Sequence, residues 1–269
     1  KSKGVSAFFW SGVNTGGVQF IGLIFSIVLA RLLSPEDFYI MAIVTFVVLV
    51  SNIFVDSGLS HSLIRDQRVT KLDYDSVFYF SLVVAAICSV FIYGSAGFLA
   101  VFFNSPVIKE LMQLGSISPV IYALMAINTT IITKNLNFKL KAKLSIISLL
   151  VSGIVAVSMA LNGYGVWSLM TMHLLHPAFM MILMYINVDW KPSFHFSFYS
   201  IRHHIRFGLK LSFSNLAKIL YTKSYTLLVG KSFSAEYAGY YTRADHLKEV
   251  PTTVLGKIII RAAYPVLSM

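Results

Sequence analysis

Ionisable side chains inside long apolar runs are the residues of this sequence best suited to chemistry. Lys218 and Lys223 stand in an apolar run over residues 207–230, together with Asn215. An isolated charge that faces lipid is costly, so we expect these side chains to face a protein interior or a watery cavity. The sequence therefore predicts that both lysines supply positive charge to a cavity within the membrane. Extension of Lys223 to the membrane interface is the alternative.

Two further titratable residues in apolar runs are candidates for coupling to a proton or cation. Asp56 lies late in the second long run, where a carboxylate is a candidate functional group. A hydrogen bond near a helix end is the alternative, which the following Ser57 and Gly58 favour. His173 lies in the sixth run, and histidine titrates near neutral pH. A hydrogen bond across helices is the more common role for such a histidine.

One acidic pair resembles a metal site of nucleotide-sugar enzymes. Asp73 and Asp75 have the spacing of the carboxylates that hold a divalent metal in glycosyltransferases. Thr70 with Asp73 also fits a capping box, and we favour that interpretation because no nucleotide-binding domain surrounds the pair. The sequence shows no other metal-ligand cluster, nucleophile motif or phosphate-binding glycine loop, and its one cysteine lies in an apolar run. We therefore expect no catalytic residue, no metal and no cofactor, and no enzymatic activity.

The elements that must position these residues are long apolar helices. The mean hydropathy of +0.74, with 57% hydrophobic and 12% charged residues, is typical of integral membrane proteins. A helix needs about 20 apolar residues to span a bilayer. We expect seven spanning helices and the start of an eighth, over residues 10–30, 39–63, 77–103, 111–133, 144–162, 165–188, 207–230 and 250–269.

Lysine and arginine are distributed unequally between alternate connections. Arg31 and Lys109 are the basic residues of one side, and the loop after the seventh helix adds Lys231, Arg243 and Lys248 to it. The positive-inside rule therefore places the N-terminus in the cytoplasm, and the net charge of +11 indicates membrane topology and not a nucleic-acid partner. The N-terminal side carries Lys1, Lys3, Arg65, Arg68, Lys71, Lys134, Lys139, Lys141, Lys143, Lys191, Arg202, Arg206 and Lys210.

Two polar hinges echo each other at an offset of 200 residues. The first hinge, residues 31–39 (RLLSPEDFY), and the second hinge, residues 231–240 (KSFSAEYAGY), both follow one apolar run and begin another. Each supplies a serine that can cap a helix and acidic residues that favour its first turn. Residues 11–14 (SGVN) likewise match residues 212–215 (SFSN). An offset of six helices keeps orientation, so we predict a parallel duplication about an axis along the membrane normal.

Several motifs stand in a fixed order along the chain. They are residues 30–38 (ARLLSPEDF), 56–59 (DSGL), 163–169 (GYGVWSL), 227–230 (LLVG), 238–244 (AGYYTRA) and Pro251. Their order and spacing resemble the polysaccharide repeat-unit flippases of the multidrug/oligosaccharidyl-lipid/polysaccharide exporter superfamily, over essentially the whole chain. One position departs from that family, whose members often carry an acidic residue shortly before the Leu-Leu-x-Gly stretch. Tyr225 and Thr226 stand there in this chain.

The resemblance implies an all-α polytopic membrane protein with two six-helix lobes around a central cavity. Residues 1–195 would form the N-terminal six-helix transmembrane lobe. Residues 196–269 would supply a cytoplasmic linker and the first one or two helices of a truncated second lobe. The chain begins without methionine and ends inside an apolar stretch, so both ends read as cuts.

The function that the resemblance implies is transport across the bacterial inner membrane. Such a protein flips undecaprenyl-diphosphate-linked oligosaccharide from the cytoplasmic to the periplasmic leaflet, for O-antigen, capsule or related polymers. Its partners would be that lipid-linked oligosaccharide, membrane lipids, and a polysaccharide polymerase with its export machinery. A drug/cation antiporter of the same superfamily is an alternative that would want a more acidic cavity. A membrane-embedded glycan polymerase or transferase is another, which a large periplasmic loop would favour. The cavity candidates are Lys218, Lys223, Arg31, Asn14 and Asn215.

Overall fold

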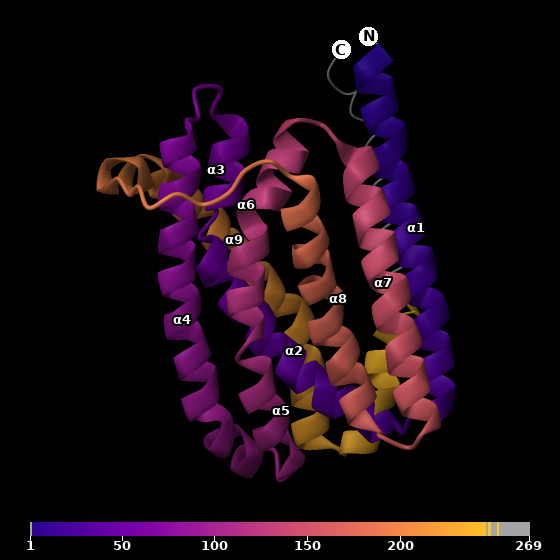
Figure 1. Cartoon of the computed structure of the whole chain (residues 1–269). Helices are drawn as coiled ribbons and strands as arrows, with labels where there is room; N and C mark the ends of the chain where they lie inside the picture. The colour runs from indigo at the N-terminus through magenta and orange to yellow at the C-terminus, as the bar shows by residue number, and fades with distance from the viewer. Residues whose placement is uncertain (1, 246, 249–251, 253–269) are drawn as a thin grey trace, which may run out of the picture.

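The computed structural model describes residues 2–245, 247–248 and 252, and within that part every regular element is a helix. Long helices run side by side between two ends of a bundle (Figure 1), as the prediction of an all-α membrane protein requires. Six of them are long and apolar enough to cross a membrane. They are α1 (Ser2–Leu32), α2 (Pro35–Asp56), α4 (Lys71–Phe102), the pair α5 (Val107–Gly115) and α6 (Ser118–Lys134), α7 (Phe138–Leu161) and α8 (Val166–Asn187).

The last long helix, α9 (Phe198–Ser232), differs from the prediction in two ways. It begins nine residues before the expected start at 207, so the connection from α8 covers only residues 188–197. It is also absent from the six helices that are apolar enough to span, and its role as a seventh span stays a prediction. Its lysines, arginines, serines and threonines lower its hydropathy. The helix packs against α2, α4 and the short α3 (Leu59–Arg65).

The expected span over residues 39–63 is wrong, because the helix breaks near its end. α2 ends at Asp56, and Ser57 and Gly58 then adopt left-handed backbone with φ of 46° and 67°. The break brings Gly58 against Gly208 of α9, where a Cβ on either glycine would overlap the other backbone. The two backbone segments can therefore touch only because both positions lack a side chain. α3 continues the chain from this contact.

The first hinge forms the helix start that its sequence predicts. The Ser34 hydroxyl oxygen accepts a hydrogen bond of 3.2 Å from the backbone N–H of Asp37. The Asp37 carboxylate accepts one of 2.9 Å from the backbone N–H of Ser34, which completes a capping box. Pro35 occupies the first helical position, where its missing N–H costs nothing. The predicted cap is confirmed.

The second hinge starts a helix earlier than expected. Residues 235–245 are helical, and the Ser234 hydroxyl oxygen accepts a hydrogen bond of 3.3 Å from the backbone N–H of Tyr237. The prediction that the next helix begins at 250, after a loop that contains Arg243, is therefore wrong. The cause is the same serine cap that starts α2. Of the expected span over residues 250–269, only Thr252 is among the described residues.

The two hinges lie against each other at one end of the bundle. A Cβ on Gly239 would overlap the backbone of Pro35, so the second helix start rests directly on the first. Arg243 reaches back to donate a hydrogen bond of 2.7 Å to the carbonyl oxygen of Leu33. Its guanidinium also stacks over the Phe38 ring, 4.7 Å from the ring centre. We call this the hinge end.

The opposite end gathers the connections that the charge pattern assigns to one side. Figure 1 shows the N-terminal end of α1, the loops after α3 and α6, and the linker 188–197 at that end. The basic residues Arg65, Arg68, Lys134 and Lys191 belong to these connections or their flanks, so we call it the basic end. The two sets of connections are thus separated as the alternation of spans predicts.

Candidate functional site

A cavity of about 430 Å³ lies among α1, α2, α8, α9 and the helical stretch 235–245. Most of its lining is apolar, with Leu29, Phe38 and Phe46 among the larger side chains. Polar and charged groups reach it from several elements and form the chemical part of the wall. They are Ser26, Thr45, His173, Lys223, Thr226, Thr242 and Asp245.

An ion pair occupies one wall of this cavity. The Lys223 Nζ lies 3.2 Å from Asp245 Oδ2, with the two side chains 31% and 19% exposed. Lys248 Nζ lies 2.9 Å from the other oxygen of the same carboxylate. One carboxylate therefore binds two ammonium groups, of which that of Lys223 lines the cavity. A largely apolar lining screens such charge less than bulk water does.

His173 of α8 lines the same cavity. Its Nε2 atom is buried and has no hydrogen-bond partner within the part of the chain that the structure describes. A buried polar nitrogen without a partner is costly, and a group entering the cavity can satisfy it. The structure therefore brings together two residues that the sequence singles out, Lys223 and His173.

The cavity is lined by positions that correspond under the predicted duplication. Thr45 and Asp245 both line it and are related by the offset of 200 residues. The same offset relates two further pairs of lining residues, Ser26 with Thr226 and Ala42 with Thr242. Such pairing is what a two-fold axis through the cavity would produce, and it supports the prediction of a parallel repeat.

The other sequence candidates do not line this cavity. Lys218, Asn215 and Arg31 are exposed, and Asn14 and Asp56 are half-buried with one side-chain oxygen lacking a partner among the described residues. Five residues of helix turn through about 500°, so Lys218 points about 140° away from Lys223. The two lysines therefore face different directions, and Lys218 does not line this cavity, so its role in a substrate cavity stays a prediction.

Sequence reasoning missed Asp245, Thr226 and Thr242. The sequence predicts a loop for the segment that contains Asp245, and it therefore gives no reason to place this carboxylate in a cavity. A signal was nevertheless present in the repeat. The offset of 200 residues maps Pro35–Thr45, the start of α2, onto residues 235–245.

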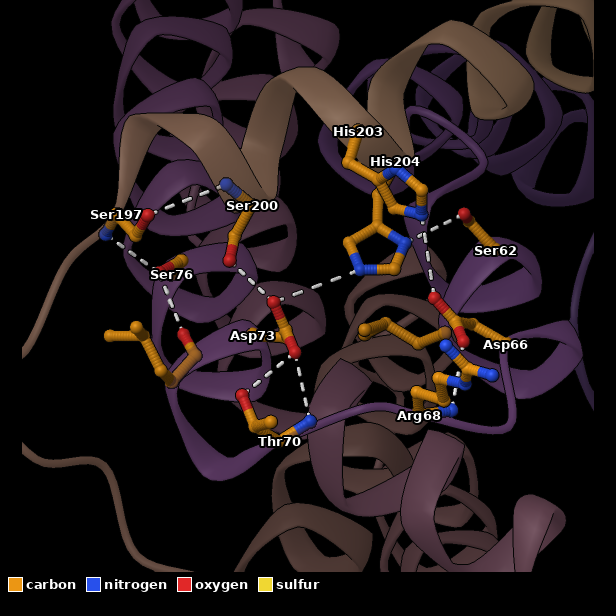
Figure 2. Close-up of polar contacts among 12 residues, drawn as sticks. Ser62, Asp66, Arg68, Thr70, Asp73, Ser76, Ser197, Ser200, His203 and His204 are labelled. Atoms are coloured by element: carbon orange, nitrogen blue, oxygen red, sulfur yellow. Dashed lines mark hydrogen bonds and ion pairs between the residues drawn. The ribbon is translucent and has the colours of Figure 1, made fainter.

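A second polar cluster lies at the basic end, where α3, α4 and α9 meet (Figure 2). His204 Nδ1 lies 2.8 Å from the Ser62 hydroxyl, and its Nε2 lies 4.0 Å from Asp73 Oδ1. The Asp73 carboxylate accepts hydrogen bonds of 2.8 Å from the Thr70 hydroxyl and backbone N–H, and another from the Ser200 hydroxyl. The predicted Thr70–Asp73 capping box is confirmed. Burial lowers the pKa of His204 from its ordinary value.

Asp66 continues this cluster toward solvent. Its Oδ1 accepts a hydrogen bond of 2.8 Å from the backbone N–H of Arg68, which lowers the pKa of Asp66. Its Oδ2 lies 3.4 Å from His203 Nε2. Lys134 donates hydrogen bonds of 2.9 and 2.6 Å to the carbonyl oxygens of Leu63 and Asp66. The loop after α3 is thereby fixed beside the start of α9.

The linker before α9 is attached to α4 next to this cluster. Ser193 donates a hydrogen bond to the Asp75 carboxylate, and the backbone N–H of Ser197 donates one of 2.9 Å to the Ser76 hydroxyl. Asp75 thus has a partner in the linker, and neither it nor Asp73 faces a nucleotide-binding domain in the described chain. Asp73 therefore caps the start of α4, as the capping interpretation predicts, and Asp75 attaches the linker to that helix.

These features define the class of protein. A bundle of long apolar helices surrounds a cavity with an ion pair, and its hydrophilic connections gather at two ends. The chain is a multi-pass helical membrane protein with an internal cavity. It belongs to the polysaccharide biosynthesis protein family, whose model matches residues 28–269. This confirms the resemblance drawn from the sequence motifs.

Relatives with assigned roles match nearly the whole chain. The succinoglycan biosynthesis transport protein ExoT of Rhizobium meliloti (strain 1021) is 24% identical over 95% of this chain and 52% of its own length. The lipopolysaccharide biosynthesis protein WzxC of Escherichia coli (strain K12) is 22% identical over 98% of this chain and 54% of its own. The teichuronic acid biosynthesis protein TuaB of Bacillus subtilis (strain 168) is 20% identical over 96% and 54%.

The chain spans about half the length of these curated relatives. The family match contains both hinges and most of the residues that line the cavity. No solved structure shows significant similarity to this chain.

Proposed function

We propose that this chain forms part of a transporter that flips a lipid-linked oligosaccharide across the bacterial inner membrane for cell-surface polysaccharide synthesis. The observation that carries the proposal is the cavity lined by corresponding positions of two repeats, with the Lys223–Asp245 pair in its wall. The names of the relatives support it, since they concern succinoglycan, lipopolysaccharide and teichuronic acid. Undecaprenyl diphosphate is the carrier that we propose.

The physical chemistry of such a substrate fits a cationic cavity. A diphosphate with attached sugars cannot cross hydrocarbon unaided, because transfer of its charges and hydroxyls out of water is costly. Lys223 provides an ammonium group in the lining, and Lys248 binds the other oxygen of the Asp245 carboxylate. Ammonium groups make strong, charge-assisted hydrogen bonds to phosphate oxygens. The polyprenyl tail can remain in the bilayer while the head group passes between the two repeats.

Alternation of access would follow from movement of one repeat against the other. The two hinges touch at Pro35 and Gly239, and Arg243 ties the second hinge to the backbone of the first. Because both contacts lie at one end, they can act as a pivot while the basic end opens and closes. Rocking of repeats around a central site is the general mechanism of such transporters. We place the basic end, with the N-terminus, in the cytoplasm.

A drug/cation antiporter is the second candidate. Asp245 favours it, because a carboxylate within a membrane cavity can bind a cation or proton. Two ammonium groups lie within 3.2 Å of that carboxylate and reduce its capacity to hold a third cation. The anionic lipid-linked glycan is therefore the better match for this wall.

A translocation assay with the intact, full-length protein tests the proposal. Reconstituted vesicles would receive a fluorescent undecaprenyl-diphosphate oligosaccharide, and its appearance in the opposite leaflet would be followed by quenching. Lys223→Ala should slow translocation at least tenfold, because it removes cavity charge. Lys218→Ala is the matched control, since it removes an exposed lysine from the same helix. Absence of translocation by the unaltered protein, or equal rates for both variants, would contradict the proposal.

A further inference from the structure

Three side chains with metal-binding atoms converge at the basic end of the bundle (Figure 2). Asp66 after α3 and His203 and His204 of α9 each offer one ligand atom, and these atoms all lie within 4.8 Å of one another. Asp66 Oδ2 and His203 Nε2 are 3.4 Å apart. Ligands about 2.0–2.1 Å from a tetrahedral zinc ion lie about 3.3–3.4 Å apart, so this pair already has the spacing of two zinc ligands.

The orientation of His204 suits a ligand. Its Nε2 faces Asp73 at 4.0 Å, which favours the proton on that nitrogen. Its Nδ1 then carries a lone pair, which accepts the hydrogen bond from the Ser62 hydroxyl at 2.8 Å and becomes available to a metal ion when that hydroxyl rotates. Histidine ligands almost always direct their second nitrogen to a carboxylate, a carbonyl or water, which fixes the tautomer. Thr70 and Ser200 hold that carboxylate in turn.

Two of the neighbouring cations have other partners, and a third, Arg68, lines the same pocket as Asp66. The Arg65 guanidinium stacks over the Phe207 ring, 4.8 Å from its centre. Lys134 donates to two backbone carbonyl oxygens of the α3 segment. Arg68 contributes its backbone N–H to Asp66, which holds the carboxylate but leaves its second oxygen directed at His203. The two carboxylates of Asp66 and Asp73 thus supply the negative charge that a divalent ion requires.

The cluster is also accessible. It lines a pocket of about 670 Å³ at the basic end, and the His203 side chain is 63% exposed. An ion can therefore enter from solvent, and water can complete its coordination. His204, by contrast, is 2% exposed and anchors the site in the fold.

We propose that Asp66, His203 and His204 bind a divalent transition-metal ion of the zinc class at the basic end. Two imidazole nitrogens and one carboxylate oxygen are the donor set that such ions accept. The bound ion would join Asp66 in the loop after α3 to His203 and His204 near the start of α9, two segments that are far apart in the chain. An ion that binds only when these segments are together would stabilise that arrangement relative to one in which they are apart. The proposal does not depend on the transported substrate.

Metal titration of the intact, full-length protein in detergent, free of any polyhistidine tag, tests the proposal. Zn²⁺ binding would be measured by calorimetry, and Co²⁺ would serve as a spectroscopic probe. We expect one equivalent to bind to the unaltered protein and the affinity to fall more than tenfold in His203→Ala. His195→Ala is the matched control, because His195 is an exposed histidine of the nearby linker, and it should leave the affinity unchanged. Asp73→Asn should weaken binding about 10–100-fold through the orientation of His204.

His203→Cys replaces one metal-binding side chain with another at an exposed position. It therefore tests the site with a variant that should fold like the unaltered protein. It should retain binding and add a thiolate-to-cobalt charge-transfer band to the spectrum. Lack of stoichiometric binding by the unaltered protein would overturn the proposal. Equal affinity of the unaltered protein and His203→Ala, or a Co²⁺ spectrum unchanged in His203→Cys, would overturn it as well. Translocation activity plays no part in these readouts, so they do not depend on the proposed transport function.

Discussion

Lys223 of α9 and Asp245 of the helical stretch that follows it pair at 3.2 Å in the wall of the membrane cavity. Thr45, 200 residues before Asp245, also lines the cavity but carries no charge. Under the predicted duplication, the two walls would correspond in position and differ in chemistry. Both members of the Lys223–Asp245 pair come from the C-terminal part of the chain, whereas the lining residues of α1 and α2 are uncharged.

Asp245→Asn and Lys223→Met should change the binding of an anionic lipid in opposite directions. Loss of the carboxylate leaves Lys223 and Lys248 without their common partner, which raises the positive potential of the cavity. We expect lipid diphosphate to bind about fivefold more tightly, or about 1 kcal/mol, to Asp245→Asn. Lys223→Met should weaken binding by a similar factor. Equilibrium binding of a fluorescent lipid diphosphate to the full-length protein measures both constants.

The double variant provides the control for this prediction. Lys223→Met combined with Asp245→Asn removes one charge of each sign and should return the affinity to near that of the unaltered protein. Weaker binding by Asp245→Asn alone would contradict the electrostatic explanation. It would favour the antiporter candidate, in which the carboxylate itself holds the transported cation.

The cavity illustrates where sequence reasoning succeeds and where it stops. Lys223 and His173 were identifiable because a charge or an imidazole inside an apolar run must find a polar environment. Lys218 satisfies the same criterion and yet lies on another face, since helical phase decides which residue enters a cavity. Only the packing of α9 on α2 and α3 fixes that phase. A backbone contact such as Gly58 against Gly208 leaves no periodic signal in the sequence.

The cluster at the basic end shows the same limit for long-range contacts. Thr70 and Asp73 were predicted as a capping box because their spacing of three residues is local. His204 lies beside Asp73 and Ser62 only after α9 has packed across α3 and α4. No spacing rule connects residues so far apart in the chain. The second hinge lies between these two extremes. The repeat offset predicts the helix over residues 235–245, whereas the hydropathy of that segment does not.

Gly239→Ala should separate the two hinges. The added Cβ would overlap the carbonyl group of Pro35, and backbone on both sides must move to admit it. We expect a loss of about 1–3 kcal/mol of stability, which is typical of overpacking. Thermal unfolding of the full-length protein in detergent measures the change. Gly97→Ala in α4 is the control, because a Cβ there meets nothing within 4 Å. It should stabilise the helix slightly, and equal effects of the two variants would show that the hinges do not touch.

Ser34→Ala and Ser234→Ala should each destabilise one helix start. Each serine hydroxyl accepts a hydrogen bond from the backbone N–H three residues later, at 3.2 and 3.3 Å. Loss of such a cap costs about 1 kcal/mol, whereas glycine at the same position costs only a few tenths. Hydrogen exchange of the first turn after each hinge would localise the effect. Faster exchange in Ser34→Ala but not Ser34→Gly is the expected pattern. Unchanged exchange after Ser234→Ala would show that the second hinge does not start a helix.

Thiol labelling in intact cells should place the hinge end outside the cytoplasm. Cys88→Ser, with serine also in place of any further cysteine of the full-length protein, provides a cysteine-free background, and single cysteines are then introduced at exposed positions of the two ends. Ser34→Cys reports on the hinge end and Gln67→Cys on the loop after α3 at the basic end. The positive-inside rule predicts that a membrane-impermeant maleimide labels the first variant in intact cells and the second only after permeabilisation. Labelling of Gln67→Cys in intact cells would reverse the orientation. It would also put the proposed metal site on the periplasmic side of the membrane.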